Sequence, residues 1–191
     1  MSEKEDLRVR RTKTLLSNAF IELMQTVPYN KICINDICDA AMVHRATFYN
    51  HFYDKDNLFN YILTSISEEL YEKAKSNKEF NTSKEMYLSL ISCAIDFLVN
   101  NRNKIQCIIK NSSEKLFNIV IDTLKRSVLY YSGKIKNEEK YVIPKEILID
   151  FFIGGLSFLG FNLIEENNFK YNKEELMRYC DVLLNEKSFL I

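Results

Sequence analysis

The polar side chains best suited to chemistry gather in one short segment of this 191-residue chain. They are Arg45, Thr47, Tyr49, Asn50 and His51. A helix from Arg45 to Phe52 would turn Phe48 and Phe52 into a core and leave these polar groups facing mostly outward. A guanidinium, hydroxyls, an amide and an imidazole all donate hydrogen bonds to phosphate oxygens and base edges. The chemistry indicated is recognition of a nucleic acid.

A second, apolar helix precedes this segment. The spacing predicts a helix from Asn35 to Ala41, and its apolar face comprises Ile34, Ile37, Cys38 and Ala41. The tight connection 41–44 joins the two helices. An apolar helix, a short turn and a helix with an exposed polar face are typical of a helix-turn-helix, whose second helix enters the DNA major groove. In that groove Arg45 is placed to contact guanine, while Thr47, Tyr49 and His51 donate to phosphates.

The segment before the helix-turn-helix is basic. Leu7 to Thr26 is predicted to be the first helix, ended by Pro28, with a broad apolar stripe of Leu15, Leu16, Ala19, Phe20, Leu23 and Met24. From Leu7 to Tyr53 there are six basic and three acidic residues, on a chain of zero net charge. The basic start, which includes Arg11, is either a solvated tail or a set of phosphate contacts. Its place ahead of a helix-turn-helix favours phosphate contact.

A fourth helix is predicted to begin just after the helix-turn-helix. Asp54 is a good N-cap, and the apolar pattern then continues to about Lys78. A helix N-terminus carries partial positive charge, so Lys55 and the adjoining backbone are predicted to form an anion site.

The rest of the chain is also predicted to be helical. Only four Gly and two Pro interrupt it, and no alternating strand precedes a hairpin dipeptide. A helix capped by Ser83 is expected at about 84–100, and a short helix that ends at Lys110 follows it. Further helices are expected at about 114–131, after Pro144 and at 173–187. We therefore predict an all-α protein of about nine helices, with a helix-turn-helix domain at 9–69 and a ligand-binding and dimerisation domain at 70–191.

The segment EILIDFFIGGLSFLGFNLIEE is apolar on nearly every side. Its length is near the threshold for a membrane span, but Asp150, Ser157 and Asn162 interrupt it and no basic flank follows. A helix of this kind can instead be buried between its own core and a second subunit, and Gly154, Gly155 and Gly160 would permit close approach. We predict a homodimer interface and no membrane, with contacts from Phe151, Gly155, Phe158, Leu159, Asn162 and, on the last helix, Leu183.

No catalytic constellation or metal site is expected. Both histidines, His44 and His51, lie in the helix-turn-helix, and the five cysteines are scattered without a C-x-x-C pair. This pattern predicts buried thiols in a reducing cytosol rather than disulfides, zinc or a cofactor. The charged N-terminus has no apolar signal segment, so a cytoplasmic location is expected.

The block KICINDICDAAMVHRATFYNHFYDKDNLF, with its motif T-F-Y-x-H-F-x-D-K-x-x-L, resembles the N-terminal domain of the TetR/AcrR family of bacterial transcriptional regulators over residues 9–69. The stretches RVRRTKTLLSNAF and ENNFKYNKEEL resemble its dihydroxyacetone-kinase regulator-like branch. The resemblance implies an all-α homodimer that binds a double-stranded DNA operator, and a C-terminal body that binds a small effector. It implies DNA contacts by Arg45, Thr47, Tyr49, His51 and Lys55.

Three residues depart from the pattern of that family. Met42 stands at the usual turn glycine, so the turn either avoids a left-handed residue or accepts modest strain. His44 replaces the usual capping serine or threonine and is free to face a phosphate instead. Cys33 replaces a threonine that often touches phosphate. These departures put in question the pattern of backbone contacts but leave the predicted fold intact.

The function expected from these features is a ligand-responsive repressor that binds a pseudo-palindromic operator as a dimer. The first alternative is a co-activator whose body binds a protein partner. The third and lowest-ranked hypothesis is a small helical enzyme, for which the sequence offers no candidate catalytic residue. The effector is not identified by the sequence, because the aromatic residues of the body suit a core as well as a pocket.

Overall fold

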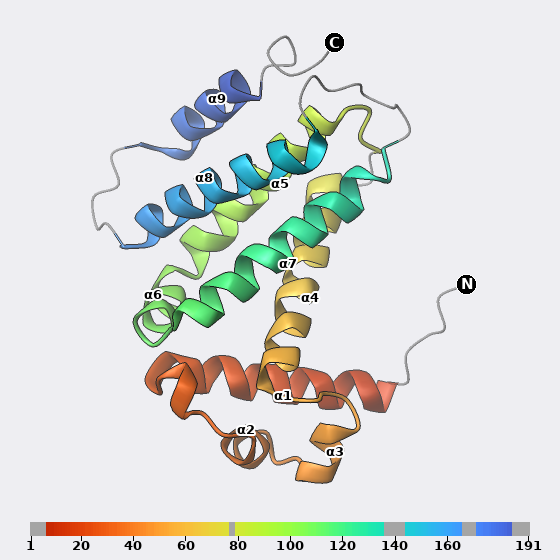
Figure 1. The fold of residues 1–191 in the computed structure, drawn as a ribbon, viewed down its shortest axis with the longest axis vertical. Helices are drawn as coiled ribbons and strands as arrows, with labels where there is room; N and C mark the ends of the chain where they lie inside the picture. Colours follow the sequence, from red (N-terminus) through yellow and green to blue (C-terminus); the bar gives the residue numbers. More distant parts are fainter. Residues whose placement is uncertain (1–6, 77–78, 136–143, 166–170, 185–191) are drawn as a thin grey trace. The chain divides into compact units, whose positions relative to one another are not determined.

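The computed structural model describes residues 7–76, 79–135, 144–165 and 171–184, and these are helical throughout apart from the connections (Figure 1). The elements are α1 (Leu7–Thr26), the 3₁₀ turn η1 (Tyr29–Lys31), α2 (Ile34–Ala41), α3 (Arg45–Tyr49), α4 (Lys55–Lys75), α5 (Ser83–Asn100), α6 (Arg102–Lys110), α7 (Glu114–Ser132), α8 (Lys145–Glu165) and α9 (Lys173–Leu183). The predicted all-α class and the number of helices in the described part are confirmed.

The chain forms two compact units. The first comprises Met1–Leu63 and Asn103–Ile119, and the second comprises Thr64–Arg102 and Val120–Ile191. The boundaries fall within α4, after the first residue of α6 and within α7, so α4 and α7 contribute to each unit. The segment 103–119 belongs with the N-terminal helices, a grouping that no sequence pattern predicts.

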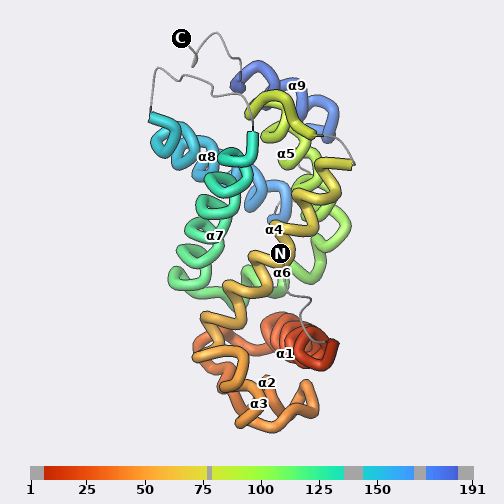
Figure 2. The backbone as a smooth tube through the Cα atoms, turned by 90° about the vertical axis from the view of Figure 1, so that its right-hand side faces the viewer, coloured from red at the N-terminus to blue at the C-terminus, as the bar shows by residue number. Residues whose placement is uncertain are grey.

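The first unit is built on one face of α1. Leu16, Phe20 and Met24 are completely or almost completely buried, and α2 and α3 lie against the same side of α1 in both views (Figures 1 and 2). The Phe20 ring lies 6.1 Å from that of Tyr29 and 6.4 Å from that of Phe59, centroid to centroid. The predicted stripe is correct except at one edge, where Leu15 is 41% exposed.

Several helix ends differ from those predicted. α3 stops at Tyr49 rather than Phe52, because the His51 N–H bonds to the Phe48 carbonyl and tightens the last turn. α4 ends at Lys75, before the expected Lys78. α5 is capped by Thr82 rather than Ser83, since the Thr82 side chain accepts from the Glu85 N–H at 3.1 Å. α9 ends at Leu183, and the expected end at Lys187 lies outside the described residues.

In the second unit α5 packs against both α8 and α9. Two ion pairs join α5 to α9: Lys84 to Asp181 at 2.8 Å and Lys173 to Asp96 at 2.7 Å. Among the described residues, α9 packs mainly against α5.

α8 buries little of its apolar surface within the chain. Leu148, Ile149, Ile153 and Ile164 are buried, whereas Phe151 is 74% and Phe158 67% exposed. By length and composition this helix could cross a membrane. Of its three glycines, Gly160 approaches another helix of the same chain, since a Cβ added there would lie 3.2 Å from Leu98 of α5. The close approach expected there therefore involves α5 rather than a second subunit.

The cysteines are all free, but they are not all buried as predicted. Cys38 and Cys180 are buried and Cys93 is partly buried, whereas Cys33 and Cys107 are exposed. Cys33 precedes α2, outside its apolar face, and Cys107 lies on the solvent side of α6.

Candidate nucleic-acid interface

α3 presents the predicted polar surface because two phenylalanines anchor it from below. Phe48 is 0% and Phe52 3% exposed, and their ring centroids are 5.8 Å apart. On the other side the helix and its flanks expose His44, Arg45, Tyr49 and Asn50, with Thr47 and His51 partly exposed. The structure thus brings the predicted α3 residues together on one surface.

Arg45 and Tyr49 form a continuous ridge on that surface. One turn apart on α3, they face each other: the Arg45 Nη2 donates to the Tyr49 Oη at 3.3 Å. The guanidinium carbon lies 5.5 Å from the ring centroid, a distance typical of a cation–π contact. Each side chain restricts the other, so the guanidinium is held at the outer edge of the helix.

The turn before α3 contains the residue that departs from the expected glycine. Met42 adopts a left-handed conformation with φ 53° and ψ 42°, so the turn accepts strain rather than avoiding it. The Met42 N–H bonds to the Asp39 carbonyl at 3.1 Å, and the Val43 N–H bonds to the Cys38 carbonyl at 2.9 Å. These are the two hydrogen bonds of a Schellman motif, which turns the chain from α2 towards α3.

The starts of the helices differ in how well they are capped. The His44 side chain makes no capping hydrogen bond to α3, and its contact with a phosphate stays a prediction. At α2 the Asp36 carboxylate accepts from the Cys33 N–H at 2.7 Å, and the exposed Cys33 thiol contacts the Lys31 carbonyl at 3.8 Å. The predicted cap of α4 is confirmed: the Asp54 carboxylate accepts from the Asn57 N–H at 2.7 Å.

Lys55 points into the first unit. Its ammonium group donates to the carbonyl oxygens of Tyr29 at 2.6 Å and Ile32 at 2.8 Å and lies 4.5 Å from the centroid of the Tyr29 ring. This geometry gives no support to a phosphate contact by Lys55, which stays a prediction. It fits a cross-link between α4 and the connection from α1 to α2.

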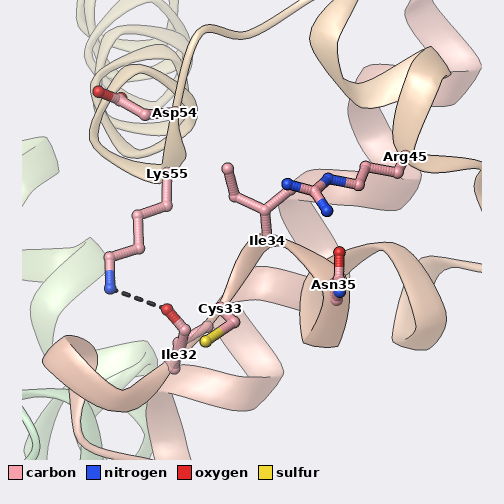
Figure 3. A pocket seen from close by; sticks show the side chains of 7 residues that line it. All are labelled: Ile32, Cys33, Ile34, Asn35, Arg45, Asp54 and Lys55. Atoms are coloured by element: carbon pink, nitrogen blue, oxygen red, sulfur yellow. Dashed lines mark hydrogen bonds between the residues drawn. The ribbon is translucent and has the colours of Figure 1, made fainter.

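Beside Lys55 is an open hollow of about 360 Å³ (Figure 3). Its lining residues are Ile32, Cys33, Ile34, Asn35, Arg45, Asp54 and Lys55. The Arg45 guanidinium reaches towards Ile34, while the Lys55 ammonium turns away to the Ile32 carbonyl. The hollow therefore brings together two predicted contact residues, Cys33 just before α2 and Arg45 of α3. Arg11 is exposed on α1 and does not line it.

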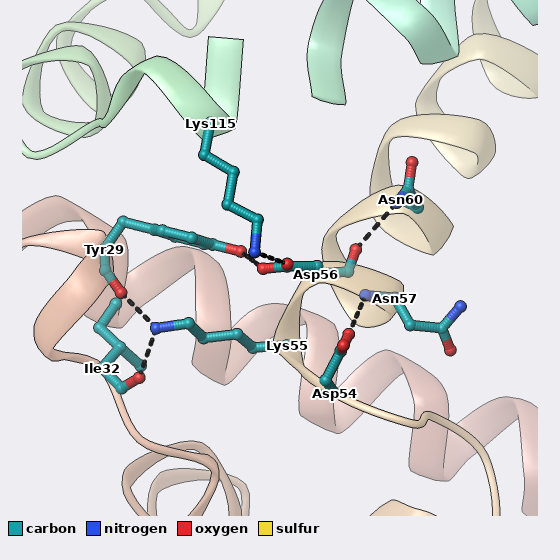
Figure 4. A network of polar contacts seen from close by, with 8 residues as sticks. All are labelled: Tyr29, Ile32, Asp54, Lys55, Asp56, Asn57, Asn60 and Lys115. Carbon is teal, nitrogen blue, oxygen red and sulfur yellow. Dashed lines mark hydrogen bonds and ion pairs between the residues drawn. The ribbon is translucent and has the colours of Figure 1, made fainter. Parts of the chain in front are cut away.

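A polar network that sequence reasoning missed lies at the start of α4 (Figure 4). The Asp56 carboxylate accepts a hydrogen bond from the Tyr29 hydroxyl and forms an ion pair with Lys115 of α7. Burial alone would raise the pKa of Asp56, but hydrogen bonds from Lys115 and Tyr29 outweigh it and lower that pKa. The pKa of Tyr29 is raised, mainly by burial and to a smaller extent by the hydrogen bond to Asp56. Only the place of Asp56 in the first helical turn was visible in the sequence.

Comparison with known proteins identifies the domain that carries this surface. Residues 17–62 match the model described as "Bacterial regulatory proteins, tetR family". Over 59 residues the chain is 36% identical to the HTH-type dhaKLM operon transcriptional activator DhaS of Lactococcus lactis, a match that covers 31% of this chain and 32% of that protein. The chain thus matches about a third of the length of this curated relative. The identity of the relative agrees with the predicted dihydroxyacetone-kinase regulator-like branch.

Solved structures share the fold along nearly the whole chain. Lin0861 from Listeria innocua aligns with a TM-score of 0.71 at 18% identity, covering 96% of this chain and 94% of that one. A TetR transcriptional regulator from Streptococcus agalactiae 2603V aligns with a TM-score of 0.60 at 22% identity, covering 95% and 97%. At these identities the likeness concerns the fold. Residues 17–62 thus have the sequence of the N-terminal domain of the tetR family of bacterial regulatory proteins.

Proposed function

We propose that this protein is a DNA-binding transcriptional regulator whose DNA-binding domain is residues 9–69. The observation that carries the proposal is the ridge of α3, where Arg45 and Tyr49 face solvent while Phe48 is buried beneath them. In the major groove Arg45 would contact a guanine, a contact worth about 1–3 kcal/mol of discrimination. Phosphate contacts by Tyr49, Thr47 and His51 would set the register.

Further phosphate contacts would come from the edges of that surface. His44 lies at the start of α3 with its imidazole uncommitted to capping. Cys33 and Arg45 line the hollow, which would receive the DNA backbone. Arg11 extends the positive surface along α1. Contacts of this kind add affinity that falls steeply with salt.

The protein would act as a homodimer through α8. Phe151, Phe158 and Leu159 are exposed on it at 74%, 67% and 39%, and a Cβ added at Gly155 would meet nothing within 4 Å. Asn162 of α8 and Leu183 of α9 would complete the contact. An isologous interface of this kind presents two recognition helices to half-sites about 34–36 Å apart, or a multiple of that.

Two polar contacts favour a partner subunit over a membrane as the cover for α8. Lys125 of α7 forms an ion pair with Asp150 of α8 at 2.7 Å, and the Arg102 Nε donates to the Ile164 carbonyl at 3.2 Å. Charged groups near both ends of the helix thus bind it to its own chain. In hydrocarbon such groups would be costly. A regulator that binds DNA as proposed would work in the cytoplasm.

Regulation would come from a small-molecule effector bound in the body, which would act against operator binding and make the protein a repressor. An effector of this kind is typically coupled to DNA binding by about 1–3 kcal/mol. The second candidate is an activator whose body binds a protein partner. It is favoured by the likeness of the N-terminal segment to DhaS, which is described as an activator.

A gel shift with the promoter region of the protein's own gene, at low and moderate salt, tests the proposal. Wild-type protein should form a sequence-preferring complex, and Tyr49→Ala should weaken it about tenfold, or 1.4 kcal/mol. Tyr130→Ala is the matched control, because Tyr130 is 63% exposed but lies on α7 in the second unit. A wild type without sequence preference, or a complex unaffected by Tyr49→Ala, would contradict it.

A further inference from the structure

The turn between α6 and α7 is bound to the N-terminal helices through Asn111. The side-chain amide of Asn111 donates to the Met24 carbonyl at 3.3 Å and to the Gln25 carbonyl at 3.0 Å. Its backbone carbonyl accepts from the Tyr29 N–H at 2.9 Å. One residue thus makes three hydrogen bonds to the segment where α1 ends and η1 begins.

These hydrogen bonds do the work of a helix cap. The last carbonyls of a helix have no partner within it, and those of Met24 and Gln25 lie in the final turn of α1. An amide NH₂ has two donors, which suit two neighbouring carbonyls. The end of α1 is therefore capped by a side chain 86 residues further along the chain from Gln25.

Lys115, in the first turn of α7, makes the second link to the N-terminal helices. Its ammonium pairs with Asp56 in the first turn of α4, and Asp56 also accepts from the Tyr29 hydroxyl (Figure 4). Tyr29 is only 3% exposed, so this side of the network is shielded from water. Asp56 thereby joins three segments of the first unit: η1, α4 and the start of α7.

The two links hold both ends of the helix-turn-helix. In the chain, α2 and α3 lie between η1, which Asn111 holds, and the first turn of α4, which Lys115 holds. We propose that Asn111 and Lys115 are positioning residues for the recognition helix α3, although they lie outside residues 9–69. This inference rests on the proposed DNA-binding function. It extends the working DNA-binding unit to the turn between α6 and α7.

Operator binding by Asn111→Ala and Lys115→Met tests the inference. Each should weaken binding to the promoter duplex by about threefold to thirtyfold, the range found for residues that contact neither ligand. Affinity for a random duplex of equal length should not change, because phosphate contacts dominate it. Lys115→Arg should restore specific binding, and Lys104→Met, which removes the same charge from an exposed site on α6, should behave as wild type. Specific binding that is unchanged, or lost together with random-duplex binding, would overturn the inference.

Hydrogen exchange without DNA separates this inference from the proposed function. Amides of α3 and of the last turn of α1 should exchange at least about threefold faster in Asn111→Ala and Lys115→Met than in Lys104→Met, since local opening becomes easier. A wild-type protein without promoter preference would contradict the proposed function. The exchange rates would still show whether Asn111 and Lys115 position α3. Equal exchange in all the variants would overturn the positioning role.

Discussion

α1 and α8 are almost the same length, 20 and 21 residues, yet they relate to the protein core in opposite ways. α1 carries its apolar residues on one stripe, and Phe20 at the centre of that stripe is 0% exposed. α8 is apolar on nearly every side and leaves Phe151 and Phe158 at 74% and 67% exposed. A stripe is covered by one layer of neighbouring helices, whereas an all-round apolar helix needs cover on two sides.

The difference separates the apolar surface that the chain covers by itself from the surface that a second subunit would cover under the proposed dimer. In the first unit the charged side chains of Lys55 and Asp56 have partners within the unit. On α8 large aromatic side chains, each able to bury about 150–250 Å², remain uncovered. We therefore expect changes on α1 to unfold the protein and changes on α8 to dissociate it.

The largest effect should come from emptying the core beneath α1. Phe20→Ala removes a ring packed against Tyr29 and Phe59 and should lower the free energy of unfolding by about 3–5 kcal/mol. Urea unfolding measures this loss. Leu15→Ala on the same helix is the control, since Leu15 is 41% exposed and should cost much less. Equal losses from the two variants would show that α1 has no one-sided core.

A charge on the uncovered face of α8 should act on assembly instead. Phe158→Glu should weaken the dimer by about 2 kcal/mol or more, roughly thirtyfold, because a carboxylate would be buried in an apolar contact. Sedimentation over a range of concentrations measures this shift. Phe117→Glu is the matched control, as Phe117 is 53% exposed on α7 in the first unit. A wild type that stays monomeric, or a dimer unaffected by Phe158→Glu, would refute this half of the comparison.

Substitution of Lys55 tests whether its ammonium group binds within the first unit or contacts a DNA phosphate. Lys55→Met leaves the carbonyls of Tyr29 and Ile32 without this donor and should destabilise the fold by about 1–3 kcal/mol. The slope of log affinity against log salt should nevertheless stay that of wild type, because no phosphate contact is lost. Arg11→Met, on the exposed edge, should reduce that slope by about 1. A reduced slope in Lys55→Met would restore Lys55 as a phosphate contact.

The predictable features are those determined by residues near one another in the chain. The burial of Phe48 and Phe52, the outward ridge at Arg45 and Tyr49, and the Asp54 cap all follow from spacing within a single turn or two. Sequence periodicity determines which face of a helix is buried. It does so without reference to the rest of the fold, and this is why the helix-turn-helix could be recognised.

The missed features depend on partners far along the chain. The Lys55 ammonium turns to a carbonyl 26 residues away, and the Asn111 amide caps carbonyls 86 and 87 residues away. A long flexible side chain can turn outward or inward from the same backbone position. The resemblance to a family suggested the outward direction for Lys55, and only the tertiary arrangement showed the inward one.

The smallest predicted effect concerns the strained turn of the first unit. Met42 is left-handed and 92% exposed, so its side chain contributes little packing while its backbone conformation costs about 1–2 kcal/mol for a residue with a Cβ. Met42→Gly removes that cost but adds chain entropy in the unfolded state, and a net gain of about 0.5–1 kcal/mol is expected. The melting temperature should rise by about 2 °C. Met42→Ala keeps the Cβ and should melt as wild type does, so a rise in both variants would trace the effect to the side chain and not to the left-handed backbone.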